Sequence, residues 1–454
     1  MTTSLLIDPR TGLLTRVAPQ PRDPRMPSAW RGHGATVSRI DRVLNWRADG
    51  FGFGAALSAA ERARHAAIGE AVERYCGNAV PPGLVVASHA ELSARGIDAV
   101  DPRTVALYAA EQYRLPGFPF TPVDEHTRLG WASGTDLVTG GEVLVPAAEV
   151  YLNYDGTGHG EPPIHSLSYS GIATGPTRQL AEQSALEEIF ERDACTIWWA
   201  SGASTVELDD GGRISGAIGR PGLGTDLTIR LLRIPTDLPA PVVAAFIEDD
   251  GDGGPFVAFG SACRSSVEDA ATKALMEALG LLQLSYQLAD QDSDVWAAVG
   301  RDDIEAHVFL PYRADRRYAD DIVAEYRQLT DLPAIAQLYQ DPRMQGPPLD
   351  RLRPRDTVPL TAVAAPPSGE ARPYYLRRLA ERGFRAVAVD VTTDDVRRAG
   401  LTVVRVVVPG LVGNAPPAFP LRGSDRYYTV PAALGWDRVP LRFDDLITQP
   451  IPLA

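Results

Sequence analysis

The chain has 454 residues and a formal net charge of −14 at pH 7, with 44% hydrophobic and 22% charged residues. This length exceeds the usual size of a single core, so we expect one large composite domain or two to three smaller ones. The acidic balance argues against a surface that binds nucleic-acid phosphates or anionic lipids.

Two segments precede the first strong helix signal. Residues 1–50 are rich in Pro and Arg with short strand-like runs, and we expect an extended lead-in that packs on a later core, with partial disorder as the alternative. The Gly-rich sequence DGFGFGAALS at 49–58 is then expected to open a helix with Ser58 as its N-cap. This helix continues to Cys76, where Gly, Asn and Pro residues end it.

The middle of the chain alternates strand signals with a second long helix. Residues 83–165 contain strand candidates such as GGEVLVPAAEVYLNY, separated by Gly and Asp. The sequence SYSGIATGPT predicts a loop that leads into a helix from about Thr177 to Trp199. Two apolar runs around an Asp/Gly turn at 240–263 predict a β-hairpin.

The remaining elements follow in the same order. The segment SVEDAATKALMEALGLLQLSYQ predicts a third long helix at 266–287. Residues 384–411 show a strand, a short helix and a buried strand in succession, as in a β-α-β unit. The elements together predict a mixed α/β protein.

The three cysteines, Cys76, Cys195 and Cys263, include no C-x-x-C pair, which argues against a disulfide framework and a zinc knuckle. The N-terminal residues lack a basic stretch followed by an apolar run. No segment approaches the roughly 20 apolar residues that span a bilayer. We therefore expect a cytoplasmic protein without a membrane segment.

The sequence Glu-x-x-Glu-Arg occurs in both of the first two helices. Positions i, i+3 and i+4 share one helical face, so each helix presents two carboxylates and a guanidinium together. The residues concerned are Glu70, Glu73 and Arg74 in the first helix and Glu188, Glu191 and Arg192 in the second. The neighbouring positions are apolar in both helices.

Clustered carboxylates in a poorly hydrated place repel one another and take up protons unless a cation lies between them. Magnesium binds one or two carboxylates together with nucleotide phosphates, and a guanidinium pairs with phosphate. The motifs therefore favour a Mg²⁺ and phosphate site. A solvent-exposed ion pair gives the same spacing and stays open as an alternative for either motif. An exposed acid is likewise the alternative for Glu277 of the third helix.

Other types of site are poorly supported. Lys273 is the only lysine and follows no Gly-rich loop, so a Walker phosphate loop is excluded. No G-x-S-x-G sequence is present. His159 and His165 are more typical of a loop than of a metal site, and Cys195 is more typical of a small buried apolar residue.

Six segments, in this order along the chain, resemble the YcaO family. They are GEAVERYCGN, SYSGIATGPT, SALEEIFERDACTIWW, KALMEA, DVTTDDVRRAGLTVVRVVVPGL and QPIPLA. Within the family they most resemble the cyclodehydratase component of thiazole/oxazole-modified peptide biosynthesis. The resemblance implies a mixed α+β domain in which two similar submodules bring their acidic helices to one nucleotide cleft. It implies a lead-in at 1–50, the YcaO domain at 51–430 and a proline-containing tail at 431–454.

The resemblance also implies an activity. A Cys, Ser or Thr side chain of a ribosomal precursor peptide attacks the preceding backbone amide. ATP then phosphorylates the amide-derived oxygen, and loss of phosphate leaves an azoline. The implied cofactors are ATP and Mg²⁺. The implied partners are the precursor peptide, a protein that binds its leader, because the lead-in is too short for a fused leader-binding domain, and a second copy or a second YcaO subunit.

Individual roles follow from the matching positions. The family pattern implies magnesium ligands at Glu70, Glu73, Glu188 and Glu191, nucleotide contacts at Arg74, Arg192, Glu277, Glu70 and Glu188, and a tail that reaches the active site at Pro450, Pro452 and Ala454. Four positions depart from the pattern, because Phe53 replaces a lysine, Ala66 a serine, Pro176 an asparagine and Leu180 an acid. The glutamine expected just after Glu277 is also absent, with Gln283 further along. Each departure removes a polar contact to nucleotide or metal.

These departures keep two alternatives open. The first is a catalytically weakened paralogue that acts as a scaffold or presents the peptide within a modification complex. The second is an amide activator that uses another nucleophile, such as sulfide or a backbone amine. Retention of both Glu-x-x-Glu-Arg motifs and of the proline tail favours the cyclodehydratase.

Overall fold

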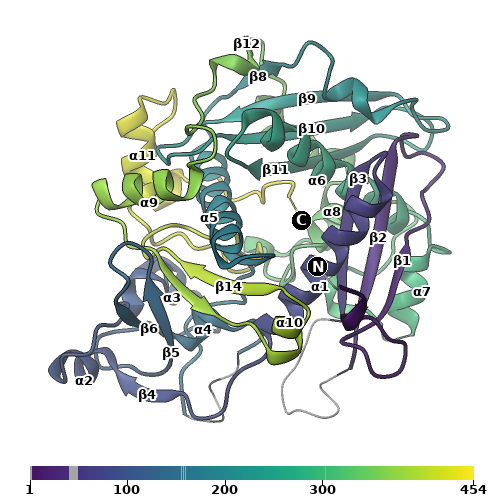
Figure 1. Cartoon of the computed structure of the whole chain (residues 1–454). Helices are drawn as coiled ribbons and strands as arrows, with labels where there is room; N and C mark the ends of the chain where they lie inside the picture. Colours follow the sequence, from purple (N-terminus) through teal and green to yellow (C-terminus); the bar gives the residue numbers. More distant parts are fainter. Residues whose placement is uncertain are drawn as a thin grey trace.

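The computed structural model describes residues 3–39, 50–154, 156, 158, 160–301 and 303–453. Its strands form sheets of three, five and six strands. Figure 1 shows the five-stranded sheet at the top, the six-stranded sheet at the lower left and the three-stranded sheet at the right. Helix α5 (Arg178–Ser201) contacts β14 and β7 of the six-stranded sheet and β11 of the five-stranded sheet. The fold is therefore mixed α/β, as predicted.

The lead-in contributes two strands of the three-stranded sheet. The sheet has the order β1 (Leu14–Pro19), β2 (Trp30–Val37) and β3 (Phe51–Leu57), with antiparallel pairing throughout. Helix α1 (Ala60–Gly77) packs on it. Leu6, Leu14 and Val37 are buried in the same core as the apolar residues of α1, which confirms that the lead-in packs on a later core. The expected boundary at residue 50 falls between two paired strands, and the proposed division into three parts stays a prediction.

The Gly-rich segment forms strand β3, so the prediction that it opens the helix was wrong. Its glycines are needed for packing, because a Cβ on Gly54 would lie 2.2 Å from the backbone nitrogen of Ala67 on α1. Local sequence could not reveal this approach of strand to helix backbone. Ser58 adopts a φ of 55° and is not the N-cap; that position belongs to Ala59, which makes no side-chain capping bond.

The six-stranded sheet has the order β4-β5-β13-β14-β7, with β6 also paired to β5. Its strands are β4 (Val85–Ser88), β5 (Arg128–Asp136), β6 (Glu142–Pro146), β7 (Ile172–Gly175), β13 (Val387–Asp390) and β14 (Thr402–Val407). Short helices α2 (His89–Ala94), α3 (Ala110–Tyr113) and α4 (Ala147–Val150) lie between these strands in the chain. The strand expected around 142–146 is thus confirmed, and a helical turn follows it.

The unit predicted as β-α-β has the expected elements with a different pairing. Helix α10 (Asp394–Arg398) connects β13 to β14, and these two strands are antiparallel neighbours. The β-α-β prediction was therefore wrong in strand direction. A parallel crossover needs a dozen or more residues and a helix long enough to run back along the sheet, whereas α10 has five residues.

The second helix begins where the sequence predicts. The side chain of Thr177 accepts a hydrogen bond from the backbone N–H of Leu180, which caps α5, and Gly202 ends the helix in a left-handed conformation. The segment before it was predicted as a loop, but its residues 172–175 form the edge strand β7.

The five-stranded sheet has the order β11-β10-β9-β8-β12. Its strands are β8 (Val206–Asp209), β9 (Leu227–Ile234), β10 (Val242–Asp249), β11 (Phe256–Cys263) and β12 (Thr357–Pro359). Strands β10 and β11 pair antiparallel from Val242 opposite Cys263 to Asp249 opposite Phe256, which confirms the hairpin. The third helix, α6 (Val267–Leu288), is capped by Ser266 and packs on β10 and β11.

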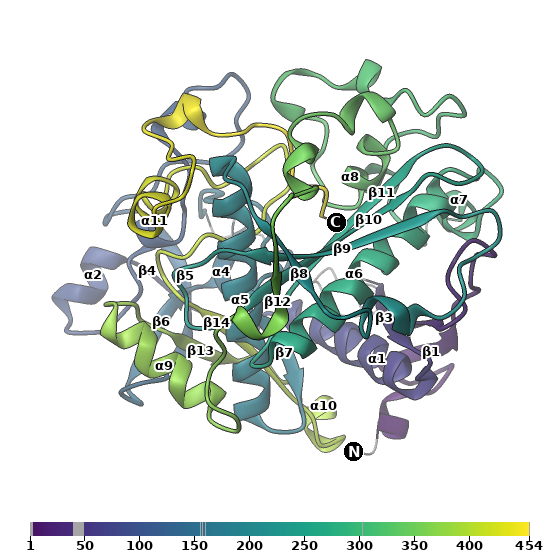
Figure 2. The same ribbon diagram turned by 90° about the horizontal axis from the view of Figure 1, so that it is seen from above.

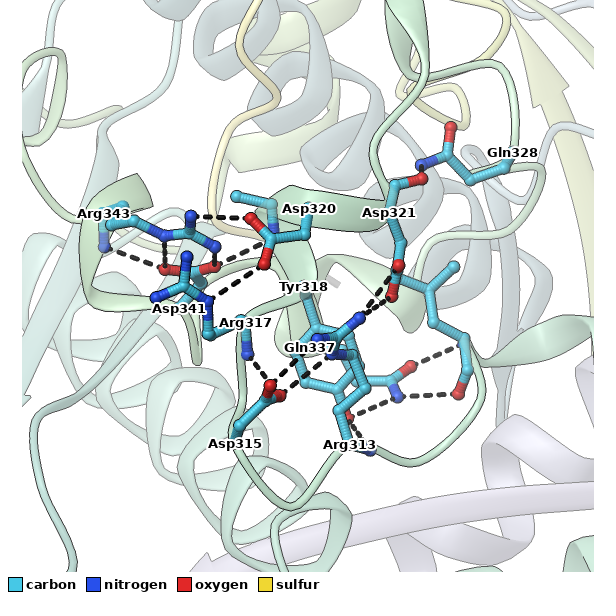
Figure 3. Close-up of polar contacts among 12 residues, drawn as sticks. Arg313, Asp315, Arg317, Tyr318, Asp320, Asp321, Gln328, Gln337, Asp341 and Arg343 are labelled. Carbon is cyan, nitrogen blue, oxygen red and sulfur yellow. Dashed lines mark hydrogen bonds and ion pairs between the residues drawn. The ribbon is translucent and has the colours of Figure 1, made fainter.

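The segment between α6 and β12 consists mainly of turns and short helices. It includes the short helices α7 (Asp294–Gly300) and α8 (Ala334–Leu338). Figure 3 shows the ion pairs that hold its turns together. Arg343 lies 2.7 Å from Asp320 and 2.6 Å from Asp341, and Arg313 lies 2.8 Å from Asp321. Such a network fixes turns more effectively than isolated surface ion pairs would.

A buried ion pair joins α5 to the C-terminal region, which contains α9 (Ala371–Glu381) and α11 (Arg426–Leu434). The Arg426 guanidinium contacts both carboxylate oxygens of Asp193 at 2.6 and 2.8 Å. Burial raises the pKa of Asp193, whereas Arg426 and the Val412 backbone N–H oppose this rise. The pair is fully bonded, as a buried charge pair must be.

The tail runs back into the protein after α11, as the yellow trace in Figure 2 shows. The indole Nε1 of Trp199 on α5 donates to the Gln449 carbonyl at 2.7 Å, and the Tyr339 hydroxyl donates to the Pro450 carbonyl. Pro450 and Pro452 are buried, and Leu453 is 5% exposed.

All three cysteines are buried. Burial raises the pKa of both Cys76 and Cys195 to about 12, and it also raises the pKa of Cys263. Within the described part of the chain, each helix falls short of the combined length and apolarity that crossing a bilayer requires.

Candidate functional site

Strand β7 and the residues before it bring one acid from each Glu-x-x-Glu-Arg helix together. The backbone N–H of Thr174 donates to Glu73 Oε1 at 2.7 Å, and the Thr174 hydroxyl donates to the Gly69 carbonyl at 3.2 Å. The backbone N–H of Gly171 donates to Glu188 Oε2 at 3.1 Å. Gly171 has a φ of 88°, so a glycine is needed to orient this N–H. The acidic helices therefore converge, as predicted.

Electrostatics show that the two acids lie close to one another. Burial raises the pKa of Glu73 to about 8; the Thr174 N–H opposes the rise, and Glu188 and Glu70 add to it. Burial also raises the pKa of Glu188, against the influence of Arg192. Glu191 adds to the rise for Glu188, so each of the two acids has its pKa raised further by a neighbouring carboxylate.

The other two residues of the first motif form an ion pair beside this acid pair. Arg74 Nη2 lies 3.0 Å from Glu70 Oε1, and Glu70 Oε2 accepts a hydrogen bond from the Phe53 N–H at 2.9 Å. The Arg74 guanidinium also lies 3.9 Å from the centre of the Tyr169 ring. Tyr169 was missed by sequence reasoning, although it belongs to the motif SYSGIATGPT. The ring restricts where the guanidinium can point.

The second motif repeats the pattern in a more buried setting. Arg192 lies 3.3 Å from Glu191 and 3.8 Å from Glu188. Burial alone would lower the pKa of Arg192, but the two acids outweigh it and raise the pKa. The hydroxyl of Ser261 on β11 donates to Glu191 at 2.7 Å. Because Glu191 is only 7% exposed in its side chain and Glu188 is 27% exposed, Glu188 is the more accessible of the two.

The third helix adds another pair of charges. Lys273 and Glu277, one turn apart on α6, form an ion pair. The side chain of Glu277 is 46% exposed, as the alternative of an exposed acid expects, and its pKa is lowered because Lys273 and then Arg192 outweigh the partial loss of hydration. Glu277 therefore lies within electrostatic range of α5. Lys273 was not predicted as a site residue; the signal available was that the chain's single lysine lies one turn before a predicted site acid.

The carboxylates fit a magnesium ion only together with ligands from another molecule. Among the described residues, no group of three or more His, Cys, Asp or Glu side chains is placed to hold a metal ion. Magnesium commonly takes one or two carboxylates and completes its coordination with phosphates and water. The pair Glu73 and Glu188 offers hard oxygen ligands whose mutual repulsion a cation would relieve, so the residues present fit Mg²⁺ bound to a polyphosphate.

The structure also shows the surroundings of the four residues that replace polar residues of the family pattern. The Phe53 ring packs against Trp30, with ring centres 6.2 Å apart, so this side chain supplies no charge to the acids. Ala66, Pro176 and Leu180 are exposed to solvent. Leu180 is 50% exposed, which is unusual for a large apolar side chain at the start of a helix.

The tail contacts α5 at a different position along the helix from the acids. Its contact with α5 is at Trp199, about two turns beyond Glu191. Ala454 and His159 lie outside the described residues. His165 lies in the segment before β7, where it pairs with Glu149 at 2.8 Å.

Comparisons with known proteins identify the family. A family model described as YcaO cyclodehydratase, ATP- and Mg²⁺-binding, matches residues 54–412. This description agrees with the expected cofactors, ATP and Mg²⁺. An uncharacterized protein of Methanothermobacter thermautotrophicus is 29% identical over 198 residues, which are 41% of this chain and 45% of that protein.

Two solved structures share the fold. A heterocyclase in complex with substrate and cofactor has a TM-score of 0.66 and 19% identity, covering all of this chain and 57% of that one. YcaO from Methanopyrus kandleri bound with AMPPCP and Mg²⁺ has a TM-score of 0.54 and 20% identity, covering 89% of this chain and 90% of that one. The chain therefore spans about half the length of the curated relative and of the heterocyclase. The family model, the shared fold and the converging acids show that the chain belongs to the YcaO cyclodehydratase family.

Proposed function

We propose that the chain is an ATP-dependent cyclodehydratase that converts Cys, Ser or Thr residues of a ribosomal precursor peptide to azolines. The observation that carries the proposal is the convergence of Glu73 and Glu188, from two helices, on strand β7. Family membership supports the reaction class, and the heterocyclase with a shared fold was solved in complex with its substrate.

The charged side chains suggest a division of roles. Glu73 and Glu188 would hold Mg²⁺, with Glu70 and Glu191 orienting the arginines of their own motifs. Arg74, Arg192 and Lys273 would neutralise phosphate oxygens. Bound ATP supplies the phosphoryl group that turns the amide oxygen into a leaving group. Phosphoryl transfer depends mainly on such positioning and charge neutralisation.

The substrate and partners follow from the same proposal. The peptide provides the nucleophile, so the protein itself needs only to hold the peptide beside the nucleotide. A separate leader-binding protein would capture the precursor. The buried tail at Pro450 and Pro452 would form one wall of the peptide path.

A second candidate function is a scaffold that presents the peptide to a complete YcaO subunit. The observation that favours it is that two positions lack the polar side chains of the family pattern. Phe53 packs on Trp30 instead, and Leu180 is an exposed apolar side chain. The retained acids favour the enzyme, because a scaffold has no need to keep two repelling carboxylates together.

The test is calorimetric titration of the folded protein with a non-hydrolysable ATP analogue and Mg²⁺. We expect binding by the wild type and its loss in Glu188→Ala. Glu61→Ala is the matched control, since Glu61 is on α1 and its side chain is 78% exposed. Wild-type protein that folds but fails to bind, even with precursor peptide present, would make the scaffold the leading function.

A further inference from the structure

A small cavity lies beside the acid site. It has a volume of about 60 Å³ and is lined by strand β14, the segment before β7, the loop after β14 and Ile189 of α5. Its polar residues are Glu149, His165, Ser166, Ser168, Ser170, Arg405 and Asn414. None of these residues was part of the predicted site.

Arg405 is the main charged group of this cavity. It is 2% exposed, and two of its nitrogens are bonded: Nε donates to the Glu149 carbonyl at 2.8 Å and Nη2 to the Ser168 carbonyl at 3.0 Å. Its Nη1 has no hydrogen-bond partner among the described residues. Buried charged donors without a partner are costly, and a guanidinium is well suited to oxyanions. The free nitrogen therefore indicates a ligand.

His165 pairs with the carboxylate of this lining. Its Nδ1 lies 2.7 Å from the Ser166 carbonyl and must carry a hydrogen there, while Nε2 lies 2.8 Å from Glu149 Oε1. Burial alone would lower the pKa of His165, but Glu149 outweighs it and raises the pKa. The pairing with His165 counters the negative charge of Glu149 toward an anion in the cavity, and Arg405 is the charged donor that remains available.

The volume of the cavity and the hydroxyl groups that line it limit which ligands it can bind. A Cβ added to Gly413 would lie 3.7 Å from Ser170 Oγ and 3.8 Å from Ser168 Oγ, so both hydroxyls border the space next to this glycine. A volume of about 60 Å³ holds only a few water molecules, because one water needs roughly 10–15 Å³. The volume of the cavity therefore suits one small anion.

We propose that this cavity binds one free inorganic phosphate ion, held by Arg405 and the hydroxyls of Ser168 and Ser170. The role assigned to it rests on the proposed function, since the cyclodehydration releases one phosphate for each azoline formed. The cavity adjoins the acid site through the chain itself, because Ser170 precedes Gly171, whose N–H holds Glu188. Phosphate that leaves the magnesium site would find a second cationic site next to it.

The test is a titration of the full chain with inorganic phosphate in EDTA and without nucleotide, followed by calorimetry or ³¹P NMR. EDTA removes the Mg²⁺ that would hold phosphate at the acid site, and variants of the cavity lining then assign the remaining binding to the cavity. We expect saturable one-site binding that Glu188→Ala retains. We expect roughly tenfold weaker binding in Ser168→Ala/Ser170→Ala, where two hydrogen bonds to an anion are lost.

Gly413→Val places a larger apolar side chain in the cavity and should weaken phosphate binding at least as much as Ser168→Ala/Ser170→Ala does. Gly216→Val is its matched control, because Gly216 has no heavy atom within 4 Å of an added Cβ. These substitutions leave Arg405 and its two backbone contacts intact, so loss of binding can be separated from loss of fold by circular dichroism.

Three outcomes would overturn the inference. They are no phosphate binding in EDTA by the folded wild type, binding that the serine and glycine variants leave unchanged, and acetate binding more tightly than phosphate, which would assign the cavity to a carboxylate. Phosphate binding in a chain that fails to bind the ATP analogue would uphold the cavity and overturn the proposed function, so the two failures are distinguishable.

Discussion

The carboxylate of Glu73 accepts its hydrogen bond from Thr174, three residues after the glycine whose N–H holds Glu188. One short strand therefore fixes the distance between acids that are more than a hundred residues apart in the chain. Displacing β7 would move both acids, whereas a change in either helix alone would move one. The relative position of the two acids therefore depends on the strand as well as on the helices.

Glu73 is expected to control the pH dependence of Mg²⁺·nucleotide binding. Its pKa is raised to about 8, so below that pH a proton competes with the metal ion. Affinity for Mg²⁺ and the ATP analogue should rise with pH up to about 8 and then level off. Calorimetry between pH 6.5 and 9 in two buffers of different ionisation enthalpy measures the affinity and the released proton. A flat profile with no proton release would contradict this assignment.

The same group should affect the stability of the nucleotide-free protein. The folded state holds the Glu73 proton more tightly than the unfolded state, so this contribution is fully present below the ordinary Glu pKa of 4.5 and is lost as pH rises through about 8. Glu73→Gln keeps a neutral group and should raise the melting temperature relative to wild type at pH 9 but not at pH 5. Glu61→Gln serves as the exposed control. An equal shift at both pH values would count against a titrating Glu73.

The glycines of β3 provide a test of packing. Gly54→Ala places a Cβ 2.2 Å from the backbone of α1 and should destabilise the protein by about 1–3 kcal/mol or more. Gly69→Ala, on α1 itself, meets no atom within 4 Å and should stabilise by about 0.5–1 kcal/mol through helix propensity. Urea unfolding of both variants measures the difference. A Gly54→Ala protein as stable as wild type would refute the close approach of strand and helix.

The buried pair of Asp193 and Arg426 should be important for stability. Asp193→Ala leaves the buried Arg426 guanidinium with Asp237, at 2.8 Å, as its carboxylate partner and should cost about 1.5–3 kcal/mol. Asp425→Ala, at the exposed neighbour of Arg426, should change the free energy of unfolding by less than about 0.5 kcal/mol. Denaturant unfolding checks both values. A loss below about 1 kcal/mol for Asp193→Ala would mean that water replaces the carboxylate.

The contacts of the tail can be tested through Tyr339. Tyr339→Phe removes the hydroxyl that donates to Pro450 and accepts from Gln449, and should cost about 1 kcal/mol. Hydrogen exchange at the Ile451 and Leu453 amides should become faster. Tyr428→Phe, which is only partly buried, is the control. Unchanged exchange would indicate that the apolar residues alone hold the tail.

Features encoded by neighbouring residues were predictable. The second and third helices begin at the expected positions next to Thr177 and Ser266, although the one expected N-cap, Ser58, was wrong, and the hairpin at 240–263 follows from its turn. Helical spacing also predicted which acids share a face. These features depend on side chains within a few residues of one another, so the sequence contains what is needed to infer them.

Features that depend on distant parts of the chain were not predictable in this way. Strand β3 looked like a loop because its glycines are explained only by the backbone of α1. The direction of β14 relative to β13 is not encoded in their apolar patterns. The cavity combines Glu149, His165 and Arg405, whose separation along the chain exceeds any local motif. Only the folded chain brings these charges together.

The burial of the three cysteines has a consequence for an enzyme that would handle peptide thiols. A thiol with a pKa of about 12 is almost entirely protonated at neutral pH, and Cys76 and Cys195 are also shielded from reagents. Cys263 shares both properties. The folded protein thus has no thiol of its own that competes with a substrate cysteine. Any reaction with an alkylating reagent would instead report local opening of α1, α5 or β11.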